Sequence, residues 1–233
     1  METLSAVVAF FQKGGPFMYP IVAVLAMGLA IAIERWIYLT VTVAKNKAVW
    51  NKVAPYLKSG NIAGAMQVTS KSKAAIAQIM TYGLNRVRSA RRREDVEQAM
   101  EESLMEVVPR LEKRTHYLAT FANISTLLGL LGTITGLISA FAAVSNANPA
   151  EKADLLSAAI SVAMNTTAFG LIVAIPMLLI HTMLTTKTTE IVDSLEMASV
   201  KFLNSIMDRA QAEPPAHPHP QQHQPGARSA AAR

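Results

Sequence analysis

GLLGTITGLISAF at residues 129–141 and TTAFGLIVAIP at residues 166–176 lie in the two apolar stretches that decide how this chain folds. These stretches, residues 118–145 and 155–184, contain no Asp, Glu, Lys or Arg. Each is longer than the about 20 residues that a helix needs to cross a bilayer. Both are rich in Gly, Ala, Ser, Thr and Asn, which is typical of spanning helices that pack closely or line a polar path. The sequence therefore predicts an all-α membrane protein organised around these two helices.

A third apolar stretch, near the N-terminus, predicts a first transmembrane helix over residues 16–43. A cleaved signal peptide is the alternative, but the apolar run exceeds the about 7–15 residues of a signal-peptide core. Trp36 and Tyr38 are expected near a membrane interface. Glu34 and Arg35 favour pairing with each other, or snorkelling at the headgroups, over a role in transport.

The composition narrows the class of protein further. The 233 residues are 51% hydrophobic, which is too apolar for an ordinary soluble domain, and they include no cysteine. The chain therefore has neither disulfides nor a thiolate nucleophile. No group of residues indicates catalysis, a cofactor, a metal site or nucleic-acid binding, so we expect a protein that is not an enzyme.

The charge distribution predicts the orientation in the membrane. Residues 45–117 carry fourteen Lys or Arg against seven Asp or Glu, whereas the turn at residues 145–154 is nearly neutral. Basic loops are retained in the cytoplasm. We therefore expect a multi-pass membrane protein whose N-terminus lies outside and whose C-terminus lies in the cytoplasm.

The same patterns divide the chain into segments. The predicted segments are an N-terminal periplasmic segment 1–15, transmembrane helix 16–43, cytoplasmic helical domain 44–117, transmembrane helix 118–145, periplasmic turn 146–154, transmembrane helix 155–184, cytoplasmic helix 185–211 and disordered tail 212–233. Ser59-Gly60-Asn61 predicts a break between two helices, and Glu94 the first turn of a long helix that Pro109 kinks. The second and third spans should each extend into the cytoplasm as one helix of about 50 residues.

Small side chains fall on one face of the second span. On a helical wheel this face holds Ser125, Gly129, Gly132, Gly136, Ser139 and Ala143. Gly132 and Gly136 form a GxxxG pair, so this face is predicted to pack closely against another helix.

The third span carries its polar side chains on two lines. Ser161 and Asn165 follow one line, and Thr167 and Gly170 follow another. Pro176 should kink the helix. On composition alone, the Thr hydroxyls of both spans are best explained by hydrogen bonds to carbonyls of their own preceding turn.

GLLGTITGLISAF and TTAFGLIVAIP resemble the two signatures of the MotA/TolQ/ExbB proton-channel family. GGPFMYPI at residues 14–21, ERWIYL at 34–39 and GNIAGAM at 60–66 resemble the ExbB type. The resemblance covers most of residues 14–186 in the right order. Three spans favour the ExbB/TolQ branch, since the MotA branch has four.

This resemblance implies a homopentamer around a central pore in a bacterial inner membrane, with the N-terminus in the periplasm and the C-terminus in the cytoplasm. An ExbD-like or TolR-like single-span dimer would sit in that pore and carry a membrane aspartate. Ion flow, of H⁺ or of Na⁺, would pass energy to a TonB-like or Tol-type protein. The resemblance also assigns an ion pathway to Thr133 and Thr167, beside which Ser161 and Asn165 could hydrogen-bond water. Val162 stands where some family members carry a glutamate, so the partner's aspartate would have to carry the charge.

Three alternatives remain open on the sequence. The first is a non-conducting membrane scaffold that oligomerises through the glycine faces, with Gly129, Gly132, Gly136 and Gly170 as its contacts. The second is a TolQ-like subunit for outer-membrane integrity. The third is a small-solute transporter, for which internal inverted repeats would be expected and none is evident.

Overall fold

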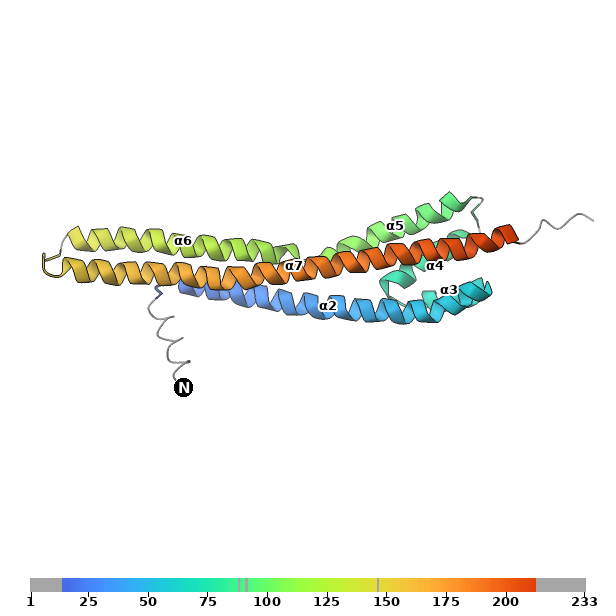
Figure 1. The fold of residues 1–233 in the computed structure, drawn as a ribbon, viewed down its shortest axis with the longest axis horizontal. Coiled ribbons are helices and arrows are strands. Elements are labelled where there is room, and N and C mark those ends of the chain that lie inside the picture. The colour runs from blue at the N-terminus through green and yellow to red at the C-terminus, as the bar shows by residue number, and fades with distance from the viewer. Residues whose placement is uncertain (1–13, 88, 91, 146, 213–233) are drawn as a thin grey trace, which may run out of the picture.

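The structure, a computed structural model, describes residues 14–212 apart from residues 88, 91 and 146, with side chains to Ile206. Most of the predicted periplasmic segment 1–15 and nearly all of the predicted tail 212–233 lie outside the described residues. Within them, every regular element is a helix, and the helices form an elongated rod (Figure 1).

The helices follow one another along the chain in the order α2 to α7. Their bounds are α2 (Met18–Ser59), α3 (Ile62–Ser70), α4 (Ala75–Val87), α5 (Arg93–Glu112), α6 (His116–Ser145) and α7 (Lys152–Ala212). Three segments are long and apolar enough to cross a membrane, and they lie in α2, in the α5–α6 segment and in α7. The predicted all-α membrane protein with three spans is therefore confirmed.

Helix α2 is longer than its apolar stretch. It continues beyond residue 43 to Ser59, so the predicted boundary at 43 marks a change of polarity within one helix and not its end. The helix stops at Gly60, whose φ of 74° is left-handed and is adopted by glycine without strain. Asn61 then caps α3, because its Oδ1 accepts a hydrogen bond of 2.8 Å from the amide of Gly64. The predicted break at this point is confirmed.

The second span does not continue as one helix, and the predicted helix of about 50 residues is wrong here. Helix α5 runs through Pro109 to Glu112, and α6 begins only at His116. Between them Arg114 has a left-handed φ of 67°. Its guanidinium reaches α2 and binds both carboxylate oxygens of Glu34 at 2.9 Å. This ion pair accompanies a backbone conformation that a non-glycine residue rarely adopts.

Arg35 acts at the same break. It is buried, and its guanidinium donates a hydrogen bond to the carbonyl of Leu111 in the last turn of α5. A cation at this end of a helix is stabilised by the helix dipole and by the carbonyls that lack intrahelical partners. The expectation that Glu34 and Arg35 pair with each other is therefore wrong. Each of them instead binds a different residue around the α5–α6 break.

Helix α7 does run unbroken, for 61 residues from Lys152 to Ala212, and includes Pro176. At about 1.5 Å per residue this is on the order of 90 Å. The prediction of one continuous helix through the third span is confirmed, and α7 is the axis along which the other helices are arranged (Figure 1). Helix α6 pairs with one end of it, whereas α4 and α5 contact the other.

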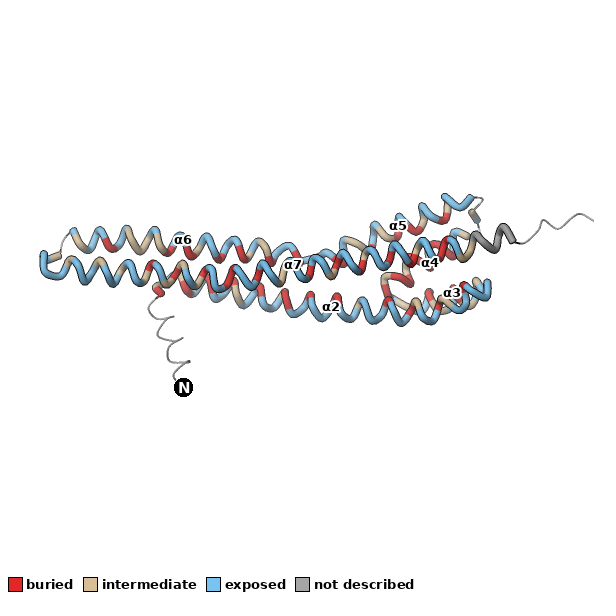
Figure 2. The backbone as a smooth tube through the Cα atoms, in the orientation of Figure 1, coloured by how far each residue is buried: buried red, intermediate tan, exposed pale blue. Residues whose placement is uncertain are grey.

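Burial differs between the two ends of the rod (Figure 2). At the α6 end, buried residues lie on the faces that α6 and α7 turn toward each other, and large side chains such as Leu127, Ile138 and Phe141 are exposed. At the other end a cluster of large side chains, including Met80, Leu84, Met100 and Phe202, is buried between α4, α5 and α7. Exposed apolar side chains at the α6 end are expected of helices that face lipid or other subunits.

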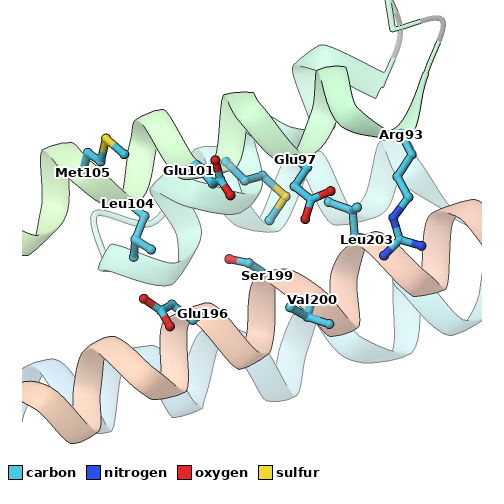
Figure 3. A pocket seen from close by; sticks show the side chains of 10 residues that line it. Arg93, Glu97, Glu101, Leu104, Met105, Glu196, Ser199, Val200 and Leu203 are labelled. Atoms are coloured by element: carbon cyan, nitrogen blue, oxygen red, sulfur yellow. The ribbon is translucent and has the colours of Figure 1, made fainter.

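A groove remains open between α5 and α7, at the end of the rod that holds the cluster around Phe202. Its volume is about 480 Å³. Met100, Leu104 and Leu203 line it, and Glu97 and Glu101 stand on the α5 side (Figure 3).

Candidate functional site

Helices α6 and α7 approach each other most closely at glycines. A Cβ atom added to Gly170 would lie 2.7 Å from the carbonyl oxygen of Ser125, which is closer than real Cβ contacts. A Cβ added to Gly129 would meet the Cα atoms of Thr167 and Gly170 at 3.2 and 3.4 Å. Backbone therefore lies against backbone at this level, which only small residues permit.

The next two glycines extend this contact along the seam between α6 and α7. Gly132 faces the side chain of Thr166, and a Cβ on Gly136 would lie 3.0 Å from Cβ of Ala163. The glycine face derived from the helical wheel thus meets α7 of the same chain. Pro176 lies further along α7 and is exposed.

Thr133 and Thr167 meet within the seam. Their hydroxyl groups are hydrogen-bonded to each other across the two helices. The Thr167 hydroxyl also lies 2.8 Å from the carbonyl oxygen of Gly129, on the opposite helix. Thr133 Oγ1 lies 3.2 Å from the same carbonyl, which is its own residue i−4. Thr167 therefore bonds across the seam, whereas Thr133 combines a cross-seam bond with the ordinary bond to its preceding turn.

The threonine pair keeps capacity for a further polar group. Each hydroxyl has one proton to donate and two lone pairs to accept. Both side chains are only partly buried, so the pair is reachable from the surface of the helix pair. One water or hydrated ion could therefore bind here without breaking the contact between the helices.

Ser161 and Asn165 are not brought to the threonine pair. Ser161 is exposed and Asn165 is partly buried. At about 100° per residue they lie on a different side of α7 from Thr167. They would have to act on a different surface from the threonine pair.

Sequence reasoning did not single out Thr166, which the structure places at a junction. Its side chain is buried, and its hydroxyl bonds both the carbonyl of Gly14 and, at 2.9 Å, that of Val162. The chain before α2 is thereby attached to α7. The signal available in the sequence was the Gly14-Gly15 pair, since Gly15 has a left-handed φ of 74°.

The spanning parts of α6 and α7 contain no carboxylate. The sequence has no Asp or Glu between residues 116 and 145, nor between 155 and 189. Glu34 of α2 is bound to Arg114 and lies at the α5–α6 break. Within the described residues, no group of three His, Asp or Glu side chains could hold a metal ion. The seam can therefore order water, but it lacks a group that readily takes up and releases a proton.

Three spans and a glycine-closed seam with a polar pair define a multi-pass membrane protein with a candidate polar path. Comparison with known proteins agrees with this class. The sequence profile of the MotA/TolQ/ExbB proton channel family matches residues 71–197. This match covers more than half of the chain, and the chain belongs to that family.

Individual relatives carry names of the same kind. A putative biopolymer transport protein ExbB homolog of Methanothermobacter thermautotrophicus is 27% identical over 193 residues, which are 82% of this chain and 67% of that protein. The putative biopolymer transport protein ExbB-like 1 of Synechocystis is 27% identical over 187 residues, covering 78% and 72%. The Tol-Pal system protein TolQ of Haemophilus influenzae is 34% identical over 93 residues, which are 40% of each chain.

Family and fold together place the protein in a class. It is a multi-pass protein of the inner membrane and an ExbB/TolQ-type proton-channel subunit of an energy-transducing system.

Proposed function

We propose that this protein conducts protons as the channel subunit of an ExbB/ExbD-type motor that energises TonB- or Tol-dependent transport across the cell envelope. The observation that carries the proposal is the hydrogen-bonded pair of Thr133 and Thr167 in the α6–α7 seam. A threonine that only satisfied its own helix would bond its own i−4 carbonyl, whereas Thr167 bonds Gly129 of α6.

The proposed assembly is a homopentamer around a pore that holds a single-span ExbD- or TolR-like dimer. The exposed apolar faces of α6 and α7, with Leu127, Ile138 and Phe141 on α6, supply surface for neighbouring copies, the dimer and lipid. Because α6 and α7 lack a carboxylate in their spans, a membrane carboxylate of the dimer must carry the proton past the threonine pair.

The orientation proposed from the charges fits this assembly. Residues 45–117 would lie in the cytoplasm and the turn at 146–154 in the periplasm. The parts of α2 and α7 beyond the spans, with α3 to α5, would then form a helical domain below the membrane.

A scaffold that oligomerises through its glycines is less well supported. Gly129, Gly132 and Gly136 already contact α7 of the same chain, so they are not free to contact a second copy. The TolQ-like branch remains the closer alternative, since TolQ is among the relatives. It differs in the system that is energised and not in the conducting site.

Proton flux into liposomes tests the proposal. The subunit should be reconstituted alone and with a single-span ExbD- or TolR-like partner. We expect no flux above empty vesicles for the lone subunit, and flux with the partner. Thr167→Val, which keeps the shape of the side chain, should lower that flux by about tenfold if this hydroxyl orders the transferred water.

The matched control is Thr135→Val. Among the described residues, the Thr135 hydroxyl bonds only carbonyls of its own helix, those of Leu131 and Gly132, so its loss should leave the flux unchanged. A full rate in Thr167→Val, with the complex intact, would contradict the assigned pathway. Robust conduction by the lone subunit would contradict the division of labour with the partner.

A further inference from the structure

A small cavity lies where α2, α4 and α5 meet, beside the end of the first span. Its volume is about 150 Å³. Pockets for small organic molecules typically measure about 300–1,000 Å³, so this cavity suits a small group such as a phosphate rather than a whole organic ligand. Its lining includes Tyr38, Lys45 and Asn46 of α2, Lys73 just before α4, Ala75 in the first turn of α4, and Arg110 of α5.

The charged side chains of the lining are all positive. Lys45, Lys73 and Arg110 line the cavity, and no Asp or Glu among the described residues does. Lys45 and Lys73 are exposed and have no ion-pair partner in the described part of the chain. Arg110 is bound to Glu106, one turn earlier on α5, which offsets one of the three charges. Two cations therefore remain uncompensated, and they attract an anion to the cavity.

The start of α4 adds to this attraction. The first amide groups of a helix lack intrahelical partners, and the helix dipole places partial positive charge there. Asn46 caps α4, because its Oδ1 accepts a hydrogen bond of 3.3 Å from the amide of Ile76. Asn46 is 6% exposed, and its Nδ2 has no acceptor among the described residues. This donor is too deeply buried to touch an occupant, so it contributes only through its partial positive charge.

The cavity lies at the level expected for lipid headgroups. On α2 it extends from Tyr38 to Asn46, across the point where the apolar run ends at Val43. Trp36 and Tyr38 are 48% and 41% exposed, and exposed Trp and Tyr are typical of the interface between membrane and water. Basic pockets at this level on the cytoplasmic side are suited to lipid headgroups.

An exposed apolar row connects the cavity to the bilayer. Val41, Ile37 and Ile33 continue from Lys45 toward the membrane at intervals of four residues, which is the spacing of a ridge along a helix. Their side chains are 43%, 57% and 53% exposed. An acyl chain whose headgroup lay in the cavity would extend along this row. Because a free phosphate ion would make no use of the row, the surface favours a lipid.

We propose that this cavity binds the phosphate of an anionic phospholipid of the cytoplasmic leaflet, with Lys45, Lys73 and Arg110 as its cations. The choice of leaflet rests on the orientation proposed above, whereas the binding itself requires no ion conduction. Since the three cations come from α2, from the start of α4 and from α5, one bound phosphate would link these helices at the membrane surface.

Lipid titration of the full-length protein in neutral detergent tests the site, with the bound lipids counted by native mass spectrometry. The probes are phosphatidylglycerol, which is anionic, and phosphatidylcholine, whose choline cancels the charge of its phosphate. The first phosphatidylglycerol should bind about tenfold or more tightly than the first phosphatidylcholine, because each nearby Lys or Arg adds to the attraction. The triple variant Lys45→Gln/Lys73→Gln/Arg110→Gln should lose this preference.

The matched control is Lys47→Gln/Lys52→Gln/Lys71→Gln, which removes the same charge at exposed positions outside the cavity. This control should keep the preference for phosphatidylglycerol. No preference in the wild-type protein, or an equal loss in both triple variants, would overturn the proposal. Excess inorganic phosphate should not displace the lipid, and displacement would overturn the assignment to a lipid in favour of a soluble phosphate.

Lysine acylation of the wild-type protein supplies a second measurement, which does not depend on any variant folding. The protein should be placed in nanodiscs of either lipid and acylated, and the modified residues read by peptide mass spectrometry. Phosphatidylglycerol should slow Lys45 and Lys73 about fivefold relative to Lys47, because an ammonium paired with a phosphate is held in its unreactive form. Equal slowing at all three lysines would show only the general surface charge and would overturn the proposal. Neither measurement involves conduction, so each decides the lipid site even if the proposed channel function fails.

Discussion

Between Ser125 and Gly136, helices α6 and α7 meet on glycine and hydroxyl groups, whereas around Phe202 helices α4, α5 and α7 meet on large apolar side chains. In the first region the contacts are backbone to backbone, with a hypothetical Cβ on Gly170 only 2.7 Å from a carbonyl oxygen. In the second, Phe202, Leu84 and Met80 are almost fully buried.

The difference follows from the solvent of each region. In water, burying a large apolar side chain stabilises the fold by about 1.5–3 kcal/mol. In lipid that gain disappears, since the surroundings are as apolar as the side chain, and close backbone contacts and hydrogen bonds remain. The glycine-closed seam is therefore suited to a bilayer and the Phe202 cluster to water.

The largest effect expected is an all-or-none pattern of thiol labelling. Ser89→Cys, in the region of the Phe202 cluster, should be protected from an impermeant reagent in intact spheroplasts. Asn148→Cys, in the turn beyond the seam, should be fully labelled. Labelling at 89 with protection at 148 would invert the orientation. Both sites should react after detergent is added, which controls for intrinsic reactivity.

Truncation of the Phe202 cluster should come next in size. Phe202→Ala should lower the free energy of unfolding by about 3–5 kcal/mol, because it removes a fully buried ring. Hydrogen exchange should accelerate in α4 and α5 and remain slow in the α6–α7 seam. Val200→Ala, at an exposed neighbouring position, is the control. Uniform acceleration along the whole rod would show that the two regions unfold as one.

A matched pair of glycine substitutions compares the regions directly. Gly170→Ala places a methyl group against backbone that cannot move aside, and should destabilise the protein by about 3 kcal/mol. Gly83 lies beside the Phe202 cluster. The Cβ atom that Gly83→Ala adds would lie 2.8–2.9 Å from side-chain atoms of Met100 and Phe202. Met100 is flexible, but the buried Phe202 ring must shift as well, and such overpacking costs about 1–3 kcal/mol. Alanine offsets part of this cost, because it favours a helix by about 1 kcal/mol over glycine, so this second change should destabilise the protein less than the first. Thermal unfolding in detergent measures both, and equal losses would contradict the distinction.

The smallest effect is expected at the boundary between the regions. Glu34→Gln removes the ion pair with Arg114, whose partners are about half exposed at 50% and 48%. Exposed pairs contribute less than about 1 kcal/mol, so stability should barely change. A loss of several kcal/mol in the same unfolding assay would mean that this pair holds the α5–α6 break in place.

Much of the fold follows from local patterns in the sequence. The lengths of the apolar runs determined three spans, and Gly60 with Asn61 determined where α2 ends and α3 begins. The helical wheel grouped the glycines that contact α7. These features depend on residues within a few turns of each other, and such patterns are visible in one sequence.

Features that depend on distant residues were missed or predicted wrongly. The ion pair at the α5–α6 break joins Arg114 to Glu34, which lies 80 residues earlier in the chain. Thr166 attaches the chain before α2 to α7, because its hydroxyl donates a hydrogen bond to the carbonyl of Gly14, 152 residues earlier.

The sequence by itself determined the class of protein, the number of spans and the family, because hydrophobic length and motif spacing are local properties. Tertiary structure alone decided that the glycine face is used within the chain and that Thr167 bonds across the seam. The physical reason is that a hydrogen bond or a close contact requires two groups to meet in space. The local sequence contains each group but does not show which distant group lies against it.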